Sequence, residues 1–251
     1  MASRSIARAK RPHPRAWGRV ACISAALILL LPLHGVWRLF GLRSPWPRRF
    51  LQFSGKTAGA DVTVTGTPLT CDVLFIANHV SWLDILVLAG KTGSAFVAKA
   101  DMAPWPIIGW MATLNNSVYV ARDQRLDVGA QSLAMKTALE TGQPLTLFPE
   151  GTTSNGTELL PFRSSLIASV TPPPQGISIQ PVAIDYGPPA PDIAWTEEEP
   201  VGVNALRVMS RPGRLAVTLH FMEPLDHADF ADRKAIAAHS RDAIAGKLFG
   251  G

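Results

Sequence analysis

The sequence predicts an α/β domain with a largely parallel central sheet flanked by helices, preceded by an N-terminal membrane-anchoring helical segment. Short apolar runs of strand length recur along residues 61–251, and helical stretches separate the earlier runs. Such alternation is typical of parallel sheets covered by helices. An uncharged run of 18 residues, Val20–Trp37, lies near the N-terminus and predicts the anchoring segment.

The apolar run is close to the minimum for a membrane-spanning helix, which needs roughly 20 apolar residues. Pro32, His34 and Gly35 are expected to weaken its last third. A secretory signal peptide is the competing interpretation, although no small-residue cleavage site follows. Bases on both sides are compatible with a helix that enters one leaflet and anchors the chain at the cytoplasmic face of the cell membrane. The expected division is a basic cytoplasmic arm (1–19), a membrane-anchoring segment with a basic linker (20–60) and a folded domain (61–251).

Charge is distributed unevenly along the chain. Residues 1–60 contain eleven Lys or Arg and no Asp or Glu, whereas residues 61–251 contain thirteen bases and nineteen acids. A nucleic-acid-binding protein would carry its basic surface on the folded domain. Basic residues around an apolar run favour an anionic membrane surface instead. We therefore expect a membrane partner and no nucleic acid; a solvated basic tail is the alternative.

The elements of the domain follow in order along the chain. Strands are expected at 73–77, 94–98, 117–121, 145–148, 177–184 and 215–221. Helices are expected at 82–88, 126–140, 162–170 and 229–248. Pro and Gly predict turns or loops at 172–174 and 187–191.

Polar residues collect where three of the expected strands end. His79 follows the first strand, Arg122 follows the third and Glu150 follows the fourth. In open α/β sheets, ligands bind beyond the carboxyl ends of the strands. We therefore expect these three side chains to belong to one site.

The first cluster runs from Asn78 to Asp84. Ser81 suits the N-cap of the following helix and Asp84 its N3 position, which turns the Asp84 carboxylate back toward His79. A carboxylate bonded to one imidazole nitrogen leaves the other nitrogen free to take a proton. The alternative is that Asp84 only caps the helix and His79 is a surface histidine.

The second cluster contains Glu150, Gly151 and Thr152. Gly lets a backbone approach a ligand closely, and Glu150 could bind a substrate hydroxyl or orient another side chain; an ordinary turn is the alternative. Arg122 suits phosphate binding, with a surface ion pair as its alternative. Pro181, within an apolar strand, indicates a sheet edge or a bulge.

Together these residues resemble the glycerolipid acyltransferase family, whose best-known members are the lysophosphatidic acid acyltransferases. The resemblance covers about residues 70–225. The family's Asn-His-four residues-Asp motif matches 78–84, its apolar strand ending in Arg matches 116–122, its Phe-Pro-Glu-Gly-Thr-Arg-Ser motif matches 148–154 except at Thr153, and its apolar stretch around Pro matches 179–184.

The resemblance implies a cofactor-free acyltransferase domain in residues 61–251. It would transfer a fatty acyl group from acyl-CoA or acyl-carrier protein to the free hydroxyl of a lysophospholipid, first of all 1-acylglycerol-3-phosphate. His79 would be the general base and Asp84 would orient it. Substrate binding would involve Asn78, Arg122, Glu150, Gly151, Thr152 and Pro181. Because Thr153 replaces a family Arg, a lyso-aminolipid or a larger headgroup is the alternative acceptor.

Two rival functions fit the sequence less well. A Ser-His-Asp lipid hydrolase would need a Gly-x-Ser-x-Gly elbow, which the sequence lacks. A non-catalytic lipid-binding membrane module would leave His79, Asp84 and Glu150 without a role. The two cysteines and six scattered histidines form no metal-binding pattern, so we expect neither a metal nor a cofactor.

Overall fold

The computed structural model describes residues 12–105, 108–120, 133, 136–168, 171, 173–196, 199–226 and 232–250. At its centre is a seven-stranded sheet with the order β1-β7-β6-β2-β5-β3-β4. The strands are β1 (Ala60–Thr65), β2 (Val73–Ala77), β3 (Ala95–Lys99), β4 (Val118–Val120), β5 (Leu145–Leu147), β6 (Ser178–Asp185) and β7 (Leu215–Phe221). Neighbouring strands are parallel except β6 and β7. The predicted α/β fold with a largely parallel sheet is confirmed.

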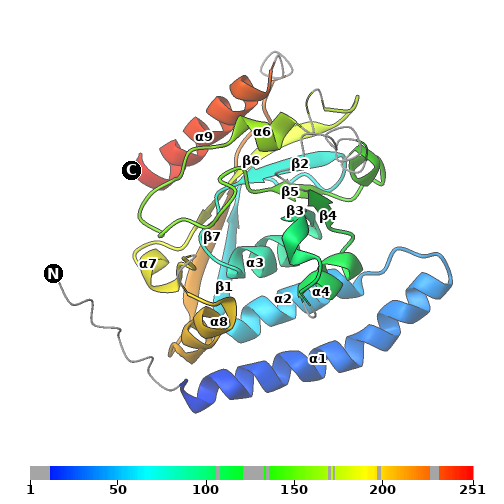
Figure 1. Cartoon of the computed structure of the whole chain (residues 1–251), viewed down its shortest axis with the longest axis vertical. Coiled ribbons are helices and arrows are strands. Elements are labelled where there is room, and N and C mark those ends of the chain that lie inside the picture. Colours follow the sequence, from blue (N-terminus) through cyan, green and yellow to red (C-terminus); the bar gives the residue numbers. More distant parts are fainter. Residues whose placement is uncertain are drawn as a thin grey trace.

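Helices cover both faces of this sheet (Figure 1). The described helices are α1 (Pro14–Leu39), α2 (Trp46–Ala58), α3 (Leu83–Thr92), η1 (Ala100–Met102), α4 (Ile108–Leu114), α6 (Ser164–Ile167), α7 (Ala190–Ile193), α8 (Val201–Ser210) and α9 (Arg233–Phe249). In Figure 1, α6 and α9 lie above the sheet, and α1, α2 and α3 lie below it.

The alternation of side chains along β2 connects the two halves of the core. Val73, Phe75 and Ala77 belong to the cluster that includes residues of α2, α3 and α8. Leu74 and Ile76 point the other way and belong to the cluster that includes residues of α6 and α9. All five side chains are completely buried, as expected for a central strand covered on both faces.

The observed elements differ from the predicted ones mainly at the margins. All six predicted strands are present, two of them with the predicted ends and the others with described ends shifted by one residue; residue 121, the predicted end of one strand, lies outside the described residues. Local sequence patterns did not indicate β1, a half-exposed edge strand paired in parallel with β7. The helices α4, α7 and α8 were not predicted either, nor was α2, which lies in the predicted basic linker. The predicted loop 187–191 runs into α7, and the predicted helix 126–140 is described only at 133 and 136–140, where it is helical.

Helix α1 continues through Pro32 to Leu39, so the residues expected to weaken its last third do not interrupt it. Tertiary contacts hold this part of the helix in place. Nδ1 of His34 lies 2.8 Å from the Ser44 hydroxyl, and the ring of Trp37 packs edge-on against Trp46 with centroids 5.7 Å apart. Packing of this kind outweighs the helix propensity of single residues.

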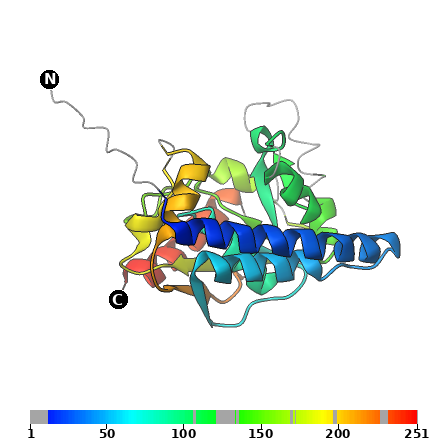
Figure 2. The ribbon, with the colours of Figure 1, turned by 90° about the horizontal axis from the view of Figure 1, so that it is seen from below.

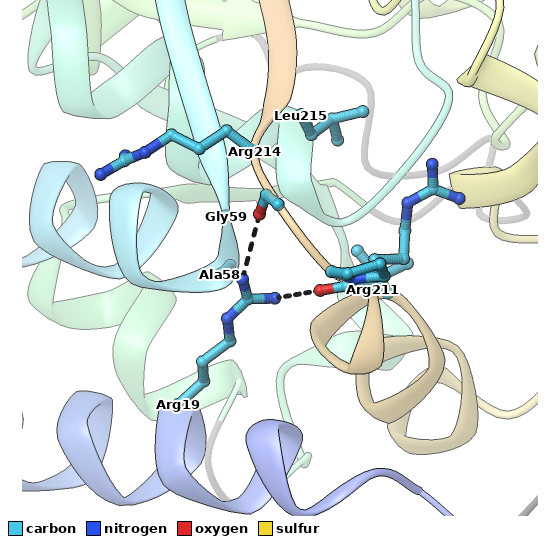
Figure 3. Close-up of a pocket in the computed structure, with 9 residues that line it drawn as sticks. Arg19, Ala58, Gly59, Arg211, Arg214 and Leu215 are labelled. Atoms are coloured by element: carbon cyan, nitrogen blue, oxygen red, sulfur yellow. Dashed lines mark hydrogen bonds between the residues drawn. The ribbon is translucent and has the colours of Figure 1, made fainter.

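Helix α1 lies alongside α2, antiparallel to it (Figure 2), and its N-terminal half is bonded to the domain. The guanidinium of Arg19 donates to the carbonyls of Met209 and Arg211 at 2.9 and 3.3 Å. Arg15 donates to the carbonyl of Ser210 at 3.1 Å. These carbonyls end α8, so the two arginines satisfy acceptors that the helix itself leaves open. Figure 3 shows Arg19 reaching from α1 to this point.

The two faces of α1 have different environments. One face packs on the core through Val20, Ile23, Ala26, Leu27 and Leu30. The other leaves large apolar side chains exposed, namely Trp17, Ile28, Leu29, Val36 and Leu39. In the part of the chain that the structure describes, α1 is the one helix long and apolar enough to cross a membrane. An exposed apolar face of this extent is typical of a surface that meets lipid or another protein.

Candidate active site

The structure brings together the ends of two neighbouring parallel strands. Strands β2 and β5 pair in register, with Ile76 opposite Leu147, so the segments that follow them leave the sheet at the same edge. The N–H of Ser154 donates to the carbonyl of His79 at 2.7 Å. The first and second sequence clusters therefore form one site, although about 70 residues separate them.

His79 and Asp84 are in direct contact. Nδ1 of His79 lies 2.7 Å from Oδ2 of Asp84. The tautomer that satisfies this contact carries its proton on Nδ1, so the lone pair of Nε2 is free. Nε2 has no hydrogen-bond partner among the described residues. The His79 side chain is 14% exposed, so a substrate can reach it.

Asp84 is held by the start of α3. Its Oδ2 also accepts the N–H groups of Val80 and Ser81 at 2.7 and 2.8 Å. The bond to Ser81 is the returning contact that the predicted capping box requires, but the N-cap of α3 is Trp82, one residue after the predicted Ser81. The Ser81 hydroxyl lies 3.4 Å from the N–H of Leu83, and the helix begins at Leu83. Local sequence therefore predicts the orientation of this carboxylate correctly.

The other oxygen of Asp84 has a partner that no sequence motif indicated. The hydroxyl of Tyr186 donates to Oδ1 of Asp84 at 2.5 Å. Tyr186 follows β6 and is buried. A Tyr at the end of an apolar strand is a weak signal, because a buried hydroxyl needs a partner but the sequence does not say which.

Aromatic rings fix the plane of the His79 imidazole. The ring of Phe148 stacks on it with centroids 4.1 Å apart and an interplanar angle of 9°. Phe148 in turn stacks on Phe96 with centroids 5.8 Å apart. The rings limit rotation of the imidazole and exclude water from one of its faces, which preserves the short bond to Asp84.

Glu150 lies behind the site, and only 1% of it is exposed. Oε1 accepts the N–H of His79 at 2.7 Å and Oε2 accepts the N–H of Leu160 at 3.0 Å. Burial raises the pKa of Glu150 from 4.5 to about 7, although the two backbone bonds oppose this rise and the nearby Asp84 charge adds to it. These contacts favour the orienting role over direct binding of a substrate hydroxyl.

Residues 151–154 line the turn after Glu150. Gly151 has a φ of 76°, a left-handed conformation that favours glycine. Thr152 is half-buried beside it. The Thr153 hydroxyl donates to the carbonyl of Trp195, and the N–H of Trp195 donates to the carbonyl of Val80 at 3.0 Å. Thr153 stands where the family motif has Arg. Its hydrogen bond to Trp195 connects the site to the segment that precedes α8.

Pro181 lies within β6, and Asn78 directly follows the end of β2. The Asn78 side chain donates to the carbonyl of Ile184 and accepts its N–H, at 3.0 and 2.7 Å, and so extends the β2–β6 pairing. The expectation that Pro181 marks an edge or a bulge is wrong, because β6 is an internal strand and its register with β2 continues through Pro181 without a skipped residue. The carbonyl of Pro181 accepts the N–H of Met222 at 3.1 Å, just beyond the end of β7. Proline has no backbone N–H to donate, and at Pro181 this lost donor falls at the end of the β6–β7 pairing, so it does not interrupt the hydrogen bonds between the two strands.

The remaining predicted site residue, Arg122, lies outside the described residues. The structure brings the other predicted residues at this edge of the sheet together, namely His79, Asp84, Glu150, Gly151 and Thr152. A base with an oriented imidazole, next to a glycine turn, is suited to removing a proton from a substrate hydroxyl.

Comparison with known proteins decides the family. The family model described as Acyltransferase matches residues 61–185. A lyso-ornithine lipid O-acyltransferase of Rhizobium meliloti (strain 1021) is 36% identical over 242 residues, which cover 88% of this chain and 82% of that protein. The chain belongs to the acyltransferase family. The resemblance inferred from the sequence motifs is confirmed.

Other relatives of this acyltransferase differ in the substrate that they are named for. A lyso-ornithine lipid O-acyltransferase of Rhodobacter capsulatus is 31% identical over 230 residues, covering 88% of this chain and 81% of that protein. A 1-acyl-sn-glycerol-3-phosphate acyltransferase of Neisseria gonorrhoeae is 38% identical over 114 residues, covering 45% and 44%. The relatives support a lyso-lipid acceptor for the family, and together with the apolar helix α1 they support membrane association.

The solved structure of the lysophosphatidic acid acyltransferase PlsC from Thermotoga maritima has the same fold as this acyltransferase. The TM-score is 0.67 at 20% sequence identity, and the match covers 91% of each chain. The shared fold extends well beyond the residues that the family model matches.

Proposed function

We propose that this acyltransferase moves a fatty acyl group from a thioester, acyl-CoA or acyl-carrier protein, to the free hydroxyl of a lyso-lipid, with His79 as general base. The observation that carries this proposal is the 2.7 Å contact between His79 Nδ1 and Asp84 Oδ2, which leaves Nε2 as the acceptor of a proton. Geometry of this kind is the usual signature of a positioned base.

The chemistry balances without a cofactor. Nε2 of His79 takes the proton as the hydroxyl oxygen attacks the thioester carbonyl carbon, and Asp84 stabilises the imidazolium. The tetrahedral intermediate then expels the thiolate, the C–S bond breaks, and the thiolate recovers the proton from His79. An ester and a free thiol are the products. Stacking of Phe148 on His79 keeps the imidazole in the plane that this transfer requires.

For the acceptor, we propose a lyso-aminolipid of the lyso-ornithine lipid type. Relatives named for that substrate match most of the chain, with 36% and 31% identity. Thr153 also supports this choice, because it replaces a cation with a hydroxyl bonded to Trp195. The acceptor that the sequence analysis placed first, 1-acylglycerol-3-phosphate, is the second candidate, since the 38% identity to a relative named for it covers 45% of the chain.

Roles for the other predicted site residues follow from their positions. Gly151 and Thr152 line the turn next to His79 and would contact the acceptor. Glu150 and Asn78 would hold the backbone on which the site is built, and Pro181 would do so from within β6. Arg122 would bind the anionic part of the acceptor headgroup.

The same proposal places the enzyme on a membrane. The exposed apolar face of α1 would enter one leaflet at the cytoplasmic face, where the thioester donors are found, and the basic residues of segment 1–60 would bind anionic headgroups. The division into arm, anchor and catalytic domain remains a prediction. Residues of α1 pack on the core, which supports a helix that stays docked on the domain while its other face meets the membrane.

The test is acyl transfer by the detergent-solubilised full chain. Radiolabelled acyl-CoA and acyl-carrier protein are each offered with lyso-ornithine lipid, 1-acylglycerol-3-phosphate and lysophosphatidylethanolamine. His79→Ala is the catalytic variant, and His239→Ala, on the exposed side of α9, is the matched control. We expect label in lyso-ornithine lipid that His79→Ala abolishes and His239→Ala retains. Label only in another lyso-lipid would change the acceptor; no His79-dependent label with either donor would reject the proposed function.

A further inference from the structure

Tyr186 makes a contact that the proposed mechanism does not use. Its hydroxyl bonds Oδ1 of Asp84 at 2.5 Å and joins residues 102 positions apart. We propose that Tyr186 is a positioning residue, which fixes the Asp84 carboxylate so that Oδ2 faces His79 and tunes the charge that His79 experiences. This inference rests on the proposed roles of His79 and Asp84.

The contacts of the carboxylate are divided between its two oxygens. Oδ2 accepts from His79 and from the N–H groups of Val80 and Ser81. Oδ1 accepts from Tyr186, its one hydrogen-bond partner within the described residues. Asp84 is completely buried, and a buried carboxylate oxygen without a donor is costly. Without the hydroxyl, Oδ1 loses the donor that fixes the carboxylate, so the carboxylate keeps its contact with His79 but holds the imidazole in a less strictly defined orientation.

Tyr186 acts as a neutral donor in this arrangement. Burial, together with the nearby negative charge of Asp84, raises the pKa of Tyr186 well above its ordinary value. The phenol therefore keeps its proton over the working pH range and gives a hydrogen bond to the carboxylate throughout. Since the side chain is buried behind Asp84, it acts through that residue and does not touch the substrate.

The bond also has an electrostatic consequence. Donation from Tyr186 draws negative charge toward Oδ1 and so reduces the stabilisation of a protonated His79 by Asp84. Removal of the hydroxyl favours protonated His79, which cannot act as a base. The acid limb of the pH–rate profile then moves to higher pH. A stronger phenolic donor moves the limb to lower pH.

Other charged groups near the pair contribute equally to all variants. Glu150 binds the N–H of His79, has a pKa of about 7 and senses the Asp84 charge, and Arg241 acts on Glu150 in turn. These groups help to set the absolute position of the acid limb. A difference between variants that change only Tyr186 isolates the effect of its hydroxyl.

The sequence offers a matched control, because it contains two tyrosines. Tyr119 donates its hydroxyl to the carbonyl of Gly109 at 2.7 Å, away from Asp84, so Tyr119→Phe removes a comparable bond. In the Tyr119→Phe background, 3-fluorotyrosine supplied during expression enters at Tyr186 alone. Its more acidic phenol is a stronger donor of nearly the same shape.

The experiment measures kcat, KM for the lyso-lipid and the pH profile of kcat/KM in the full chain. Tyr186→Phe is expected to lower kcat about tenfold, to leave KM nearly unchanged and to move the acid limb up by about 0.5 pH. The fluorotyrosine protein is expected to move the limb down, and Tyr119→Phe alone to leave it in place.

The outcomes distinguish the proposed role of Tyr186 from the proposed acyltransferase function. If the Tyr186→Phe and fluorotyrosine proteins both keep the parent acid limb, Tyr186 is only a packing residue and the inference is wrong. If Tyr186→Phe does not fold, the fluorotyrosine protein decides. Active parent protein with an inactive His79→Ala variant shows that the function stands whatever happens at Tyr186. No His79-dependent transfer in the parent overturns both.

Discussion

The backbone N–H of His79 donates to Oε1 of Glu150 across 2.7 Å, which joins residues 71 positions apart. The second oxygen of the same carboxylate accepts the N–H of Leu160. Glu150 therefore connects the loop that carries the candidate base to two segments that follow β5. Because the carboxylate is buried, this connection depends on pH.

Glu150→Gln is expected to remove a pH dependence of stability. The pKa of Glu150 is about 7 in the folded chain and 4.5 as its ordinary value. Between these values the folded state holds a proton that the unfolded state has lost, so the free energy of unfolding falls as pH rises from about 4.5 to 7. The difference is on the order of 3 kcal/mol at most. Thermal unfolding of both proteins from pH 4.5 to 7.5 checks this prediction.

The control for that measurement is Glu158→Gln, because Glu158 is exposed on the same loop. It should follow the parent protein at every pH. Glu150→Gln should be less stable at low pH, where its amide cannot accept both N–H groups, but its stability should vary less with pH. If stability varied with pH in the same way in all three proteins, Glu150 would not be the source of the pH dependence.

Asp84→Asn is expected to retain the fold and lose activity. The amide oxygen can occupy the position of Oδ2, where it accepts from Val80 and Ser81, while the amide nitrogen donates to the Tyr186 oxygen. The negative charge that stabilises protonated His79 is lost, so kcat should fall at least about 100-fold. Acyl transfer and thermal unfolding, measured together, check it. A loss of stability that matches the loss of activity would count against an electrostatic role.

Leu29→Lys is expected to weaken membrane binding without disturbing the domain. Leu29 is 69% exposed on the outer face of α1, whereas deletion of the helix would also remove residues that pack on the core. The substitution removes the burial of one Leu side chain in the leaflet, which is worth about 1.5–3 kcal/mol. Sedimentation with vesicles that contain anionic lipid measures the effect. Phe249→Lys, at an exposed site on α9, is the control, and equal losses in both variants would reject α1 as the anchor.

Arg19→Ala is expected to loosen the N-terminal half of α1. Its guanidinium donates to three carbonyls at and just beyond the end of α8, those of Met209, Arg211 and Gly213. Hydrogen exchange of the α1 amides should become faster, with a loss of about 1–2 kcal/mol in local stability. Arg38→Ala, at the exposed far end of the same helix, should leave exchange in residues 14–27 unchanged.

Thr153→Arg is expected to change the choice of acceptor. The substitution removes the hydroxyl bonded to Trp195 and adds a cation next to the candidate base, which favours a phosphomonoester headgroup. The ratio of kcat/KM for 1-acylglycerol-3-phosphate to that for lyso-ornithine lipid should rise about tenfold. Thr153→Val, which removes the hydroxyl without adding charge, separates the two effects. An unchanged ratio in Thr153→Arg would show that residue 153 does not contact the headgroup.

Much of the fold could be predicted because local patterns are strong in its central strands. Strand β2 reads as a continuous apolar run, since both of its faces are covered. The edge strand β1 alternates and is half exposed, so it gives a weaker signal. Its place beside β7, which is about 150 residues away, depends on long-range pairing that a local pattern does not contain.

The sequence by itself determined the family motifs, the α/β class and the orientation of Asp84 toward His79. That orientation follows from a capping box, which is a contact between residues three positions apart and needs no other part of the chain. Only the tertiary structure decided that the Tyr186 hydroxyl donates to the second oxygen of Asp84 and that Glu150 accepts the backbone N–H of His79. It also decided that Arg19 bonds α1 to the end of α8. These contacts join residues 71 to 190 positions apart. Their formation depends on how parallel strands and packed helices bring distant segments together.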